Sequence, residues 1–250
     1  MIRFFALFFP ALLLASPASA AQCGGDFQTF LSAMGREAQT AGVSRGVIDQ
    51  AFAGVTSDPA VLNFDRRQRG TFRKSFEEYA ATRVVPARIN RARKLMQSHA
   101  ALLGRVERQF GVPKELLMAI WTLESDNGTG DMGKLPVVRT IATLAHDCRR
   151  TELFQNELIG AYAGEIGQTQ FLPSSYIKYG VDFDGNGHVD LRRSVPDVLA
   201  STANLLKTAG WKTGQPFGEG TANFQAMREW NRATIYRKTI GYFADKLVGR

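Results

Sequence analysis

Residues 112–128, VPKELLMAIWTLESDNG, place one carboxyl group where it could work as an acid. Pro113 is tolerated in the first turn of a helix, and apolar residues then recur at helical spacing. The stripe consists of Leu116, Leu117, Ile120 and Leu123, and Glu124 continues it. Burial disfavours the charged form, so we expect a raised pKa and a proton that Glu124 can donate near neutral pH. The alternative is that Glu124 only ends the helix, which residues 126–128 terminate, and turns to solvent or caps a neighbour.

A second group of polar side chains lies in residues 160–176, GAYAGEIGQTQFLPSSY. Gly164 and Gly167 keep the backbone open, Gln168 and Gln170 present amides, and Phe171 offers an aromatic ring. Sugar sites combine such groups, because hydroxyls need hydrogen-bond partners and the faces of a sugar stack on aromatic rings. The stretch therefore predicts a carbohydrate site, with a glycine-rich turn around a buried Phe171 as the alternative.

Residues 182–193 follow the pattern of an EF-hand calcium loop over most of its length. The candidate ligands are Asp182, Asp184, Asn186 and Asp190, with Gly187 at the sharp turn and the carbonyl of His188 between them. Position 12 is Arg193 instead of the usual glutamate, so any calcium binding should be weak. The alternative is a turn held by side-chain hydrogen bonds to its own backbone.

These three stretches, in this order, closely resemble the membrane-bound lytic transglycosylase B family of peptidoglycan-cleaving enzymes. The resemblance extends from about Asp65 to the C-terminus and is best over residues 112–211. It implies a mainly α fold with a lysozyme-like (α+β) core.

The resemblance also implies a chemistry that needs a single carboxyl group. Glu124 would protonate the bond between N-acetylmuramic acid and N-acetylglucosamine, and would then take the proton of the muramyl C6 hydroxyl as it attacks C1. The product would be a 1,6-anhydro sugar. The substrate site would contain Ser125, Gly128, Gln168, Gln170, Phe171, Asn231 and Tyr236. In this family a later aspartate completes the calcium loop, and Asp197 matches it; no cofactor beyond this structural calcium is implied.

Three departures from the family pattern leave other functions open. Ala161 stands where a serine is common, Glu165 replaces a small apolar residue, and the segments 158–164 and 211–223 are short. Glu165 as a second carboxylate would allow hydrolysis, since ordinary glycosidases use two. A muramidase and a catalytically silent murein-binding or scaffold protein are therefore the two alternatives.

The helical pattern predicts an N-terminal helical region over residues 21–110 and a catalytic core over residues 111–250. Helices are expected as a pair within residues 26–55 and as one long helix from Pro86 to about residue 109. Further helices are expected at 137–147, 151–158, from about 174, at 195–210, and at the C-terminus.

Residues 1–20 have the pattern of a secretory signal peptide. Arg3 precedes the apolar residues 4–15, and Ala18 and Ala20 form a cleavage site of the A-x-A type. The apolar run is too short to span a bilayer, and Gln22 before Cys23 argues against a lipid anchor. We expect a soluble periplasmic monomer.

The net charge of +8 fits an anionic cell envelope, and export argues against nucleic acid as a partner. Only two cysteines occur, Cys23 and Cys148, and there is no C-x-x-C pair, which excludes thiolate metal sites and redox dithiols. In an oxidising compartment they suggest one disulfide, with two unpaired thiols as the alternative.

Overall fold

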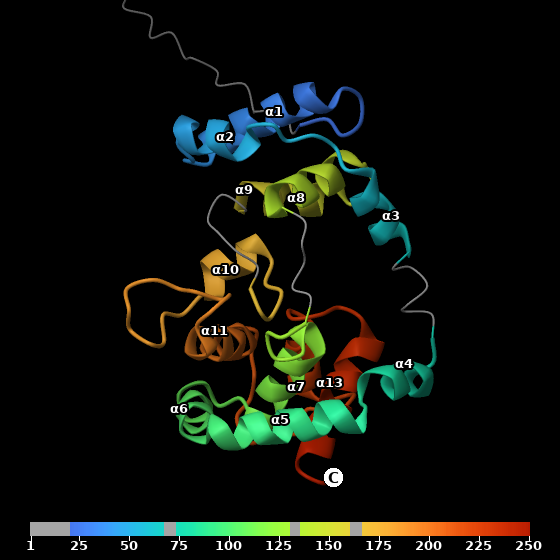
Figure 1. The fold of residues 1–250 in the computed structure, drawn as a ribbon, viewed down its shortest axis with the longest axis vertical. Coiled ribbons are helices and arrows are strands. Elements are labelled where there is room, and N and C mark those ends of the chain that lie inside the picture. The colour runs from blue at the N-terminus through green and yellow to red at the C-terminus, as the bar shows by residue number, and fades with distance from the viewer. Residues whose placement is uncertain (1–20, 68–73, 131–135, 161–166) are drawn as a thin grey trace, which may run out of the picture.

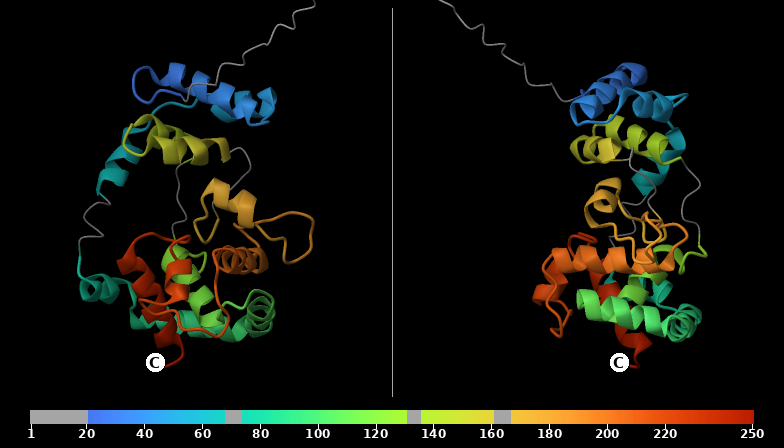
Figure 2. Two further views of the ribbon diagram at one scale, coloured as in Figure 1. Left: turned by 180° about the vertical axis from the view of Figure 1, so that it is seen from behind. Right: turned by 90° about the vertical axis from the view of Figure 1, so that its left-hand side faces the viewer.

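The computed structural model describes residues 21–67, 74–130, 136–160 and 167–250. These residues form thirteen helices, and no strand occurs among them. The mainly α prediction is confirmed. The helices gather around two apolar clusters at opposite ends of the molecule (Figures 1 and 2).

The larger cluster, which we call the α7 cluster, surrounds a central helix. Its members are α4 (Phe76–Arg83), α5 (Pro86–Ser98), α6 (Ala100–Phe110), α7 (Lys114–Ser125), α10 (Pro173–Tyr179), α11 (Val195–Thr208), α12 (Ala222–Ala226) and α13 (Thr234–Leu247). Every residue of α7 from Leu116 to Leu123 is buried. A helix that is apolar on all sides is a core helix, so α7 gives Glu124 a rigid base.

The smaller cluster, which we call the α1/α8 cluster, joins helices that lie far apart in the sequence. It joins α1 (Phe27–Thr40), α2 (Arg45–Phe52) and α3 (Pro59–Arg67) to α8 (Val137–His146) and α9 (Thr151–Gly160). Figure 1 shows α1 and α2, in blue, lying over α8 and α9. Phe30, Leu31 and Met34 of α1 are buried with Ile141 and Ala142 of α8.

Packing thus divides the chain differently from the expected boundary at residue 110. Helices α4 to α6 share their core with α7, whereas α8 and α9 pack with α1. The single long helix expected from Pro86 is wrong, because it is broken at His99, where φ is −103° and ψ is 19°. The break lets α5 pack on α7 and α13 while α6 packs on α11.

A disulfide and ion pairs hold the corner between α8 and α9. Cys23 is bonded to Cys148, which confirms the predicted disulfide. Asp65, buried at the end of α3, pairs with Arg149 and Arg150 of the corner. The predicted signal peptide, residues 1–20, lies outside the described residues. Within the part that is described, no helix has the length and apolar character needed to cross a membrane.

Candidate active site

Glu124 occupies the last turn of α7, where the chain reverses at once. Asp126 and Asn127 have left-handed φ values of 50° and 62°, and Gly128 follows with φ 75°. Asn127 is buried and its side-chain amide donates to the Thr122 hydroxyl over 3.0 Å, which stabilises this conformation. The helix therefore ends where the sequence predicted.

Two donors from the C-terminal part of the chain meet on one oxygen of Glu124. The Tyr236 hydroxyl, on α13, donates to Oε1 over 2.6 Å, and the indole N–H of Trp230 donates to the same oxygen over 3.2 Å. Burial raises the pKa of Glu124, while these two hydrogen bonds and the charge of Arg83 lower it; the net direction is upward. A raised pKa favours the protonated form of the carboxyl group, which suits acid catalysis.

Tyr236 remains a donor because its own ionisation is suppressed. Burial and the nearby charge of Glu124 raise its pKa well above the ordinary value. Its ring lies edge-on to Tyr79, with centroids 6.4 Å apart, and the Arg83 guanidinium lies 5.4 Å from the Tyr79 centroid. Two tyrosine rings therefore lie beside the carboxyl group, and the Arg83 guanidinium lies next to the Tyr79 ring.

Phe171 does not present its ring to a ligand, which corrects the sequence prediction. Its side chain is only 2% exposed and lies edge-on to Trp230, with centroids 5.6 Å apart. The apolar ring gains more from the core than from solvent, so the alternative of a buried Phe171 holds. Phe171 instead supports the indole that donates to Glu124.

Gln168 likewise serves the protein interior, contrary to the prediction. Its amide oxygen accepts from the Trp121 indole over 2.8 Å, and its amide nitrogen donates to the Arg192 carbonyl over 2.7 Å. It is 7% exposed, and a buried amide must use its hydrogen-bonding groups internally. Both ends of this amide therefore have protein partners, and neither is open to a sugar.

Ser125 and Gly128 have structural positions behind the acid. Ser125 is 3% exposed and its hydroxyl accepts from the Gly128 N–H over 2.9 Å, so it holds the turn and does not face a ligand. A Cβ on Gly128 would lie 2.4 Å from the Gln168 amide oxygen. Gly128 is thus needed for the close approach of this turn to Gln168.

Gln170 and Asn231 are less buried than the other side chains of the predicted substrate site. Gln170 is exposed, its φ is positive at 53°, and its side-chain amide donates to the Gly167 carbonyl over 3.0 Å. Asn231 is half-buried, and its side-chain oxygen accepts from the Ala233 N–H over 2.9 Å. This turn begins α13 and places Tyr236 five residues later. Gly164, Ala161 and Glu165 lie outside the described residues.

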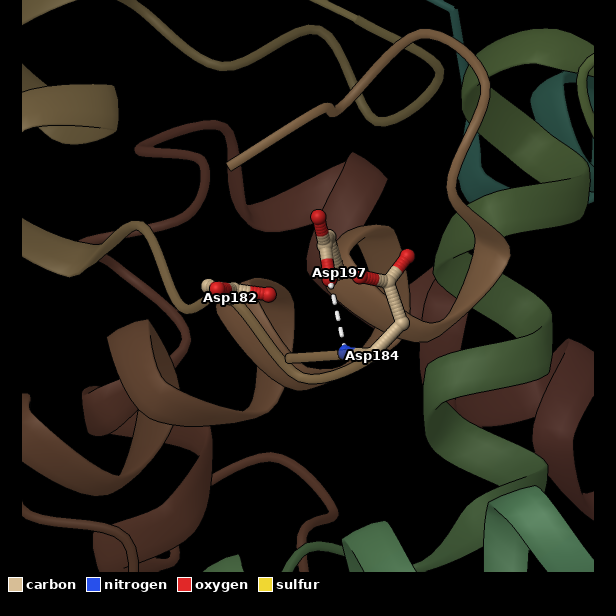
Figure 3. Close-up of side chains that lie close together, drawn as sticks. All are labelled: Asp182, Asp184 and Asp197. Atoms are coloured by element: carbon tan, nitrogen blue, oxygen red, sulfur yellow. Dashed lines mark hydrogen bonds between the residues drawn. The ribbon is translucent and has the colours of Figure 1, made fainter. Parts of the chain in front are cut away.

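The predicted calcium loop brings three carboxylates together. Oxygen atoms of Asp182, Asp184 and Asp197 lie within 4.8 Å of one another (Figure 3). Asp197 is fully buried and accepts from the backbone of Phe183 over 2.8 Å and of Asp190 over 2.9 Å. Hydrogen bonds from the Gly187, Gly185 and Asn186 backbone lower the pKa of Asp182.

The remaining predicted calcium ligands are held in the same loop. The Asn186 side chain accepts from the His188 N–H over 3.1 Å, and the Asp190 carboxylate accepts from the N–H groups of Arg192 and Arg193. Ser194 caps α11 by accepting from the Asp197 N–H over 3.3 Å. Hard oxygen ligands on a preformed loop fit calcium, and the same bonds also fit the alternative of a loop held by its own backbone.

The transglycosylase SLT domain model matches residues 26–161 and 156–221 of this chain. The chain belongs to this family. A curated relative, membrane-bound lytic murein transglycosylase B of Escherichia coli (strain K12), is 33% identical over 149 residues, 52% of this chain and 41% of that protein. The match thus spans less than half the length of this relative.

Solved structures of related proteins have the same fold. SltB3 from Pseudomonas aeruginosa, in complex with NAG-NAM-pentapeptide, is 29% identical with a TM-score of 0.81, covering 91% of this chain and 81% of that one. Slt35 from Escherichia coli, in complex with calcium, has a TM-score of 0.73 at 23% identity, covering 92% and 96%. At this identity Slt35 supports the fold alone. The family resemblance and the lysozyme-like architecture are confirmed.

Trp230 contacts Glu124, although sequence analysis did not select it. Its signal was present, since it directly precedes Asn231, but a lone tryptophan before a turn is more often a packing residue. Only the tertiary structure places its N–H on Glu124, 106 positions earlier in the chain. A second donor on the same oxygen changes the chemistry of that carboxyl group.

Proposed function

We propose that this protein is a peptidoglycan lytic transglycosylase. It cleaves the β-1,4 bond between N-acetylmuramic acid and N-acetylglucosamine and forms 1,6-anhydro-N-acetylmuramic acid. The observation that carries the proposal is the half-buried Glu124 carboxyl group, whose Oε1 accepts from both Tyr236 and Trp230. The family membership of the chain supports the same activity.

The two donors define which oxygen carries the proton. Because Oε1 already accepts two hydrogen bonds, the acidic proton of Glu124 resides on Oε2. Oε2 delivers it to the glycosidic oxygen as the C1–O bond breaks. The developing carboxylate is stabilised by the donors on Oε1, since hydrogen bonds to a charged acceptor are stronger.

The same carboxylate then completes the reaction without water. It accepts the proton of the muramyl C6 hydroxyl while that oxygen attacks C1, which restores the acid and leaves the anhydro bond. Attack from within the substrate is favoured because no separate nucleophile must be brought in and oriented. Gln170 and Asn231 position the sugar in this proposal, and the reaction needs no cofactor.

One carboxylate near Glu124 is unsuited to act as a second catalytic group. Both oxygens of Asp126 are bound by the Arg88 guanidinium, each over 2.7 Å, so neither oxygen is left for a sugar or a water. A hydrolytic muramidase would instead need Glu165 or a bound water, and a murein-binding protein would need no acid at all.

The deciding experiment is digestion of purified peptidoglycan, with mass spectrometry of the products. We expect anhydromuramyl products, one water lighter than hydrolytic ones. Reducing-end products would replace the proposal with a muramidase. Glycan binding without products would leave the scaffold function. The Glu124→Gln variant, purified in the same way, controls for contaminating lysozyme.

We further propose that the protein acts as a monomer in the periplasm, after removal of residues 1–20, on glycan strands and not on nucleic acid. The net charge of +8 becomes +7 without Arg3, which suits this anionic polymer network. Fractionation of cells followed by detection of the mature protein tests the location.

Finally, we propose a structural calcium ion in the loop of residues 182–190. Asp182, Asp184 and Asp197 would hold it, with the Asn186 side chain and the His188 carbonyl as further ligands. The cluster of three carboxylates supports this. The ion would neutralise their mutual repulsion and stabilise the start of α11, with no part in the cleavage step.

A further inference from the structure

The backbone of Ala21 is buried and bound at both of its polar groups. Its side chain is 5% exposed within the α1/α8 cluster. Its N–H donates to Oε1 of Glu37 on α1, and its carbonyl accepts from the amide of Gln155 on α9. Gln155 is itself 7% exposed. A backbone held at both of its polar groups differs from the frayed segments usual near the ends of proteins.

The residues that follow Ala21 fix its position independently. Cys23 is covalently bonded to Cys148, and the Gly24 N–H donates to the His146 carbonyl over 2.9 Å. Gly25 contributes its carbonyl to a 3.2 Å contact with the His146 ring. The nitrogen of Ala21 is therefore held against Glu37 by anchors in the residues that follow it.

We propose that Ala21 is the first residue of the mature protein and that its α-ammonium group forms an ion pair with Glu37. This inference rests on the proposed export signal, which predicts cleavage after Ala20. Hydrolysis of the Ala20–Ala21 bond consumes one water, leaves a carboxylate on Ala20 and frees the amine of Ala21, which takes up a proton at neutral pH. Processing thus converts a neutral amide donor into a cation at a carboxylate.

The pair has a defined pH dependence. Among the described residues, Ala21 contacts the Glu37 carboxylate of α1 and the neutral amide of Gln155 on α9. His146 of α8 contacts Gly24 and Gly25, three and four residues later. An ammonium beside a carboxylate has a raised pKa in the folded state. Its stabilisation is therefore full below the unfolded pKa, about 7.7–8.0, and is lost as the pH rises through the folded value.

Burial of Ala21 also sets the order of events. A protease needs an extended chain around the bond that it cuts, and the folded protein places the residue after that bond in its core. Cleavage must therefore precede docking of Ala21 and closure of the disulfide. The new charge then contributes to folding of the α1/α8 cluster.

The test compares two forms of the full mature chain, released from a fusion by a protease that leaves either Ala21 or Ser19 as the first residue. At pH 7 we expect the Ala21 form to melt about 2–4 °C higher, the shift that a modest ion pair gives in a domain of this size. Glu37→Gln should abolish the difference between the two forms, and Glu77→Gln, an exposed glutamate on α4, should leave it unchanged.

Two further measurements complete the test. In the Ala21 form, NMR titration should give an α-amino pKa above about 8, which Glu37→Gln lowers. The exported protein should have the mass of a chain beginning at Ala21. Equal melting of both forms, a difference that survives Glu37→Gln, or another first residue would overturn the inference. None of these measurements involves peptidoglycan, so failure of the proposed activity leaves them unaffected.

Discussion

The two apolar clusters of this protein are held together by different means. The α7 cluster is a broad apolar core in which α7 is enclosed by other helices. The α1/α8 cluster has few buried apolar residues, and it adds a disulfide and the ion pairs of Asp65. Small cores supply little stability, so covalent and ionic links compensate.

This difference follows from what each cluster must do. Raising the pKa of Glu124 requires a dry and rigid wall, which a large core provides. In the described part of the chain, both side chains that donate to Glu124 belong to the α7 cluster, so the α1/α8 cluster needs only to be stable. Substitutions should therefore separate activity from stability according to the cluster that they touch.

The largest effect should come from paired glutamine substitutions at two glutamates. Glu124→Gln should lower turnover by about 10³-fold, since it removes the general acid. Glu157→Gln, on α9, should instead lower stability by about 1–3 kcal/mol, because the buried Glu157 accepts from the N–H and hydroxyl of Ser174 on α10 and so joins the two clusters away from Glu124. Assays of turnover on peptidoglycan and of thermal melting should show that Glu124→Gln loses turnover and Glu157→Gln loses stability. A variant that loses both properties would contradict this division.

Glu124→Gln should also show a pH-dependent stability. A carboxyl group whose folded pKa is raised disfavours folding as the pH rises from its unfolded value through its folded value. The variant lacks this cost, so its melting temperature relative to the unsubstituted protein should increase between pH 4 and pH 7. A difference that is flat with pH would show that the carboxylate is not destabilised by burial.

The second effect concerns the disulfide. Cys23→Ser with Cys148→Ser should lower stability by up to about 4–5 kcal/mol in the chain-entropy model, roughly 10 °C in melting temperature. Because the α7 cluster has its own core, turnover at low temperature should persist and its pH profile should not move. A shifted pH profile would mean that the two clusters are coupled.

The third effect is inside the α7 cluster. Tyr236→Phe should lower turnover by about 10- to 100-fold, the loss expected for one hydrogen bond to a charged group. Since this bond lowers the pKa of Glu124, its removal should move the alkaline limb of the activity profile upward. Trp230→Phe should act in the same direction and less strongly, because its contact is longer, 3.2 Å against 2.6 Å.

The smallest effect should come from removing calcium. A chelator should lower the melting temperature by a few degrees, since an ion that binds only the folded state stabilises it. Asp184→Asn should abolish this response and leave turnover nearly unchanged. An identical melting temperature with added calcium and with chelator would remove the metal from the proposal while leaving the loop intact.

The sequence alone predicted most of the helices and placed Glu124 at the end of one of them. The helical stripe predicted α7 and the place of Glu124, the turn residues predicted its end, and two cysteines left one possible pair. The helix and its end depend on neighbouring residues, and the disulfide follows because the chain has only two cysteines. Neither requires knowledge of the tertiary structure.

The tertiary structure alone decided which predicted site residues face outward. Three of them are buried: Gln168 contacts Trp121, Phe171 contacts Trp230, and Ser125 contacts Gly128. Gln170 stays exposed. The tertiary structure also brought Trp230 and Tyr236 onto Glu124 from more than 100 positions away, and grouped α8 with α1. The physical reason is that a residue's type sets what it can bond, while packing of distant segments sets which partner is within reach.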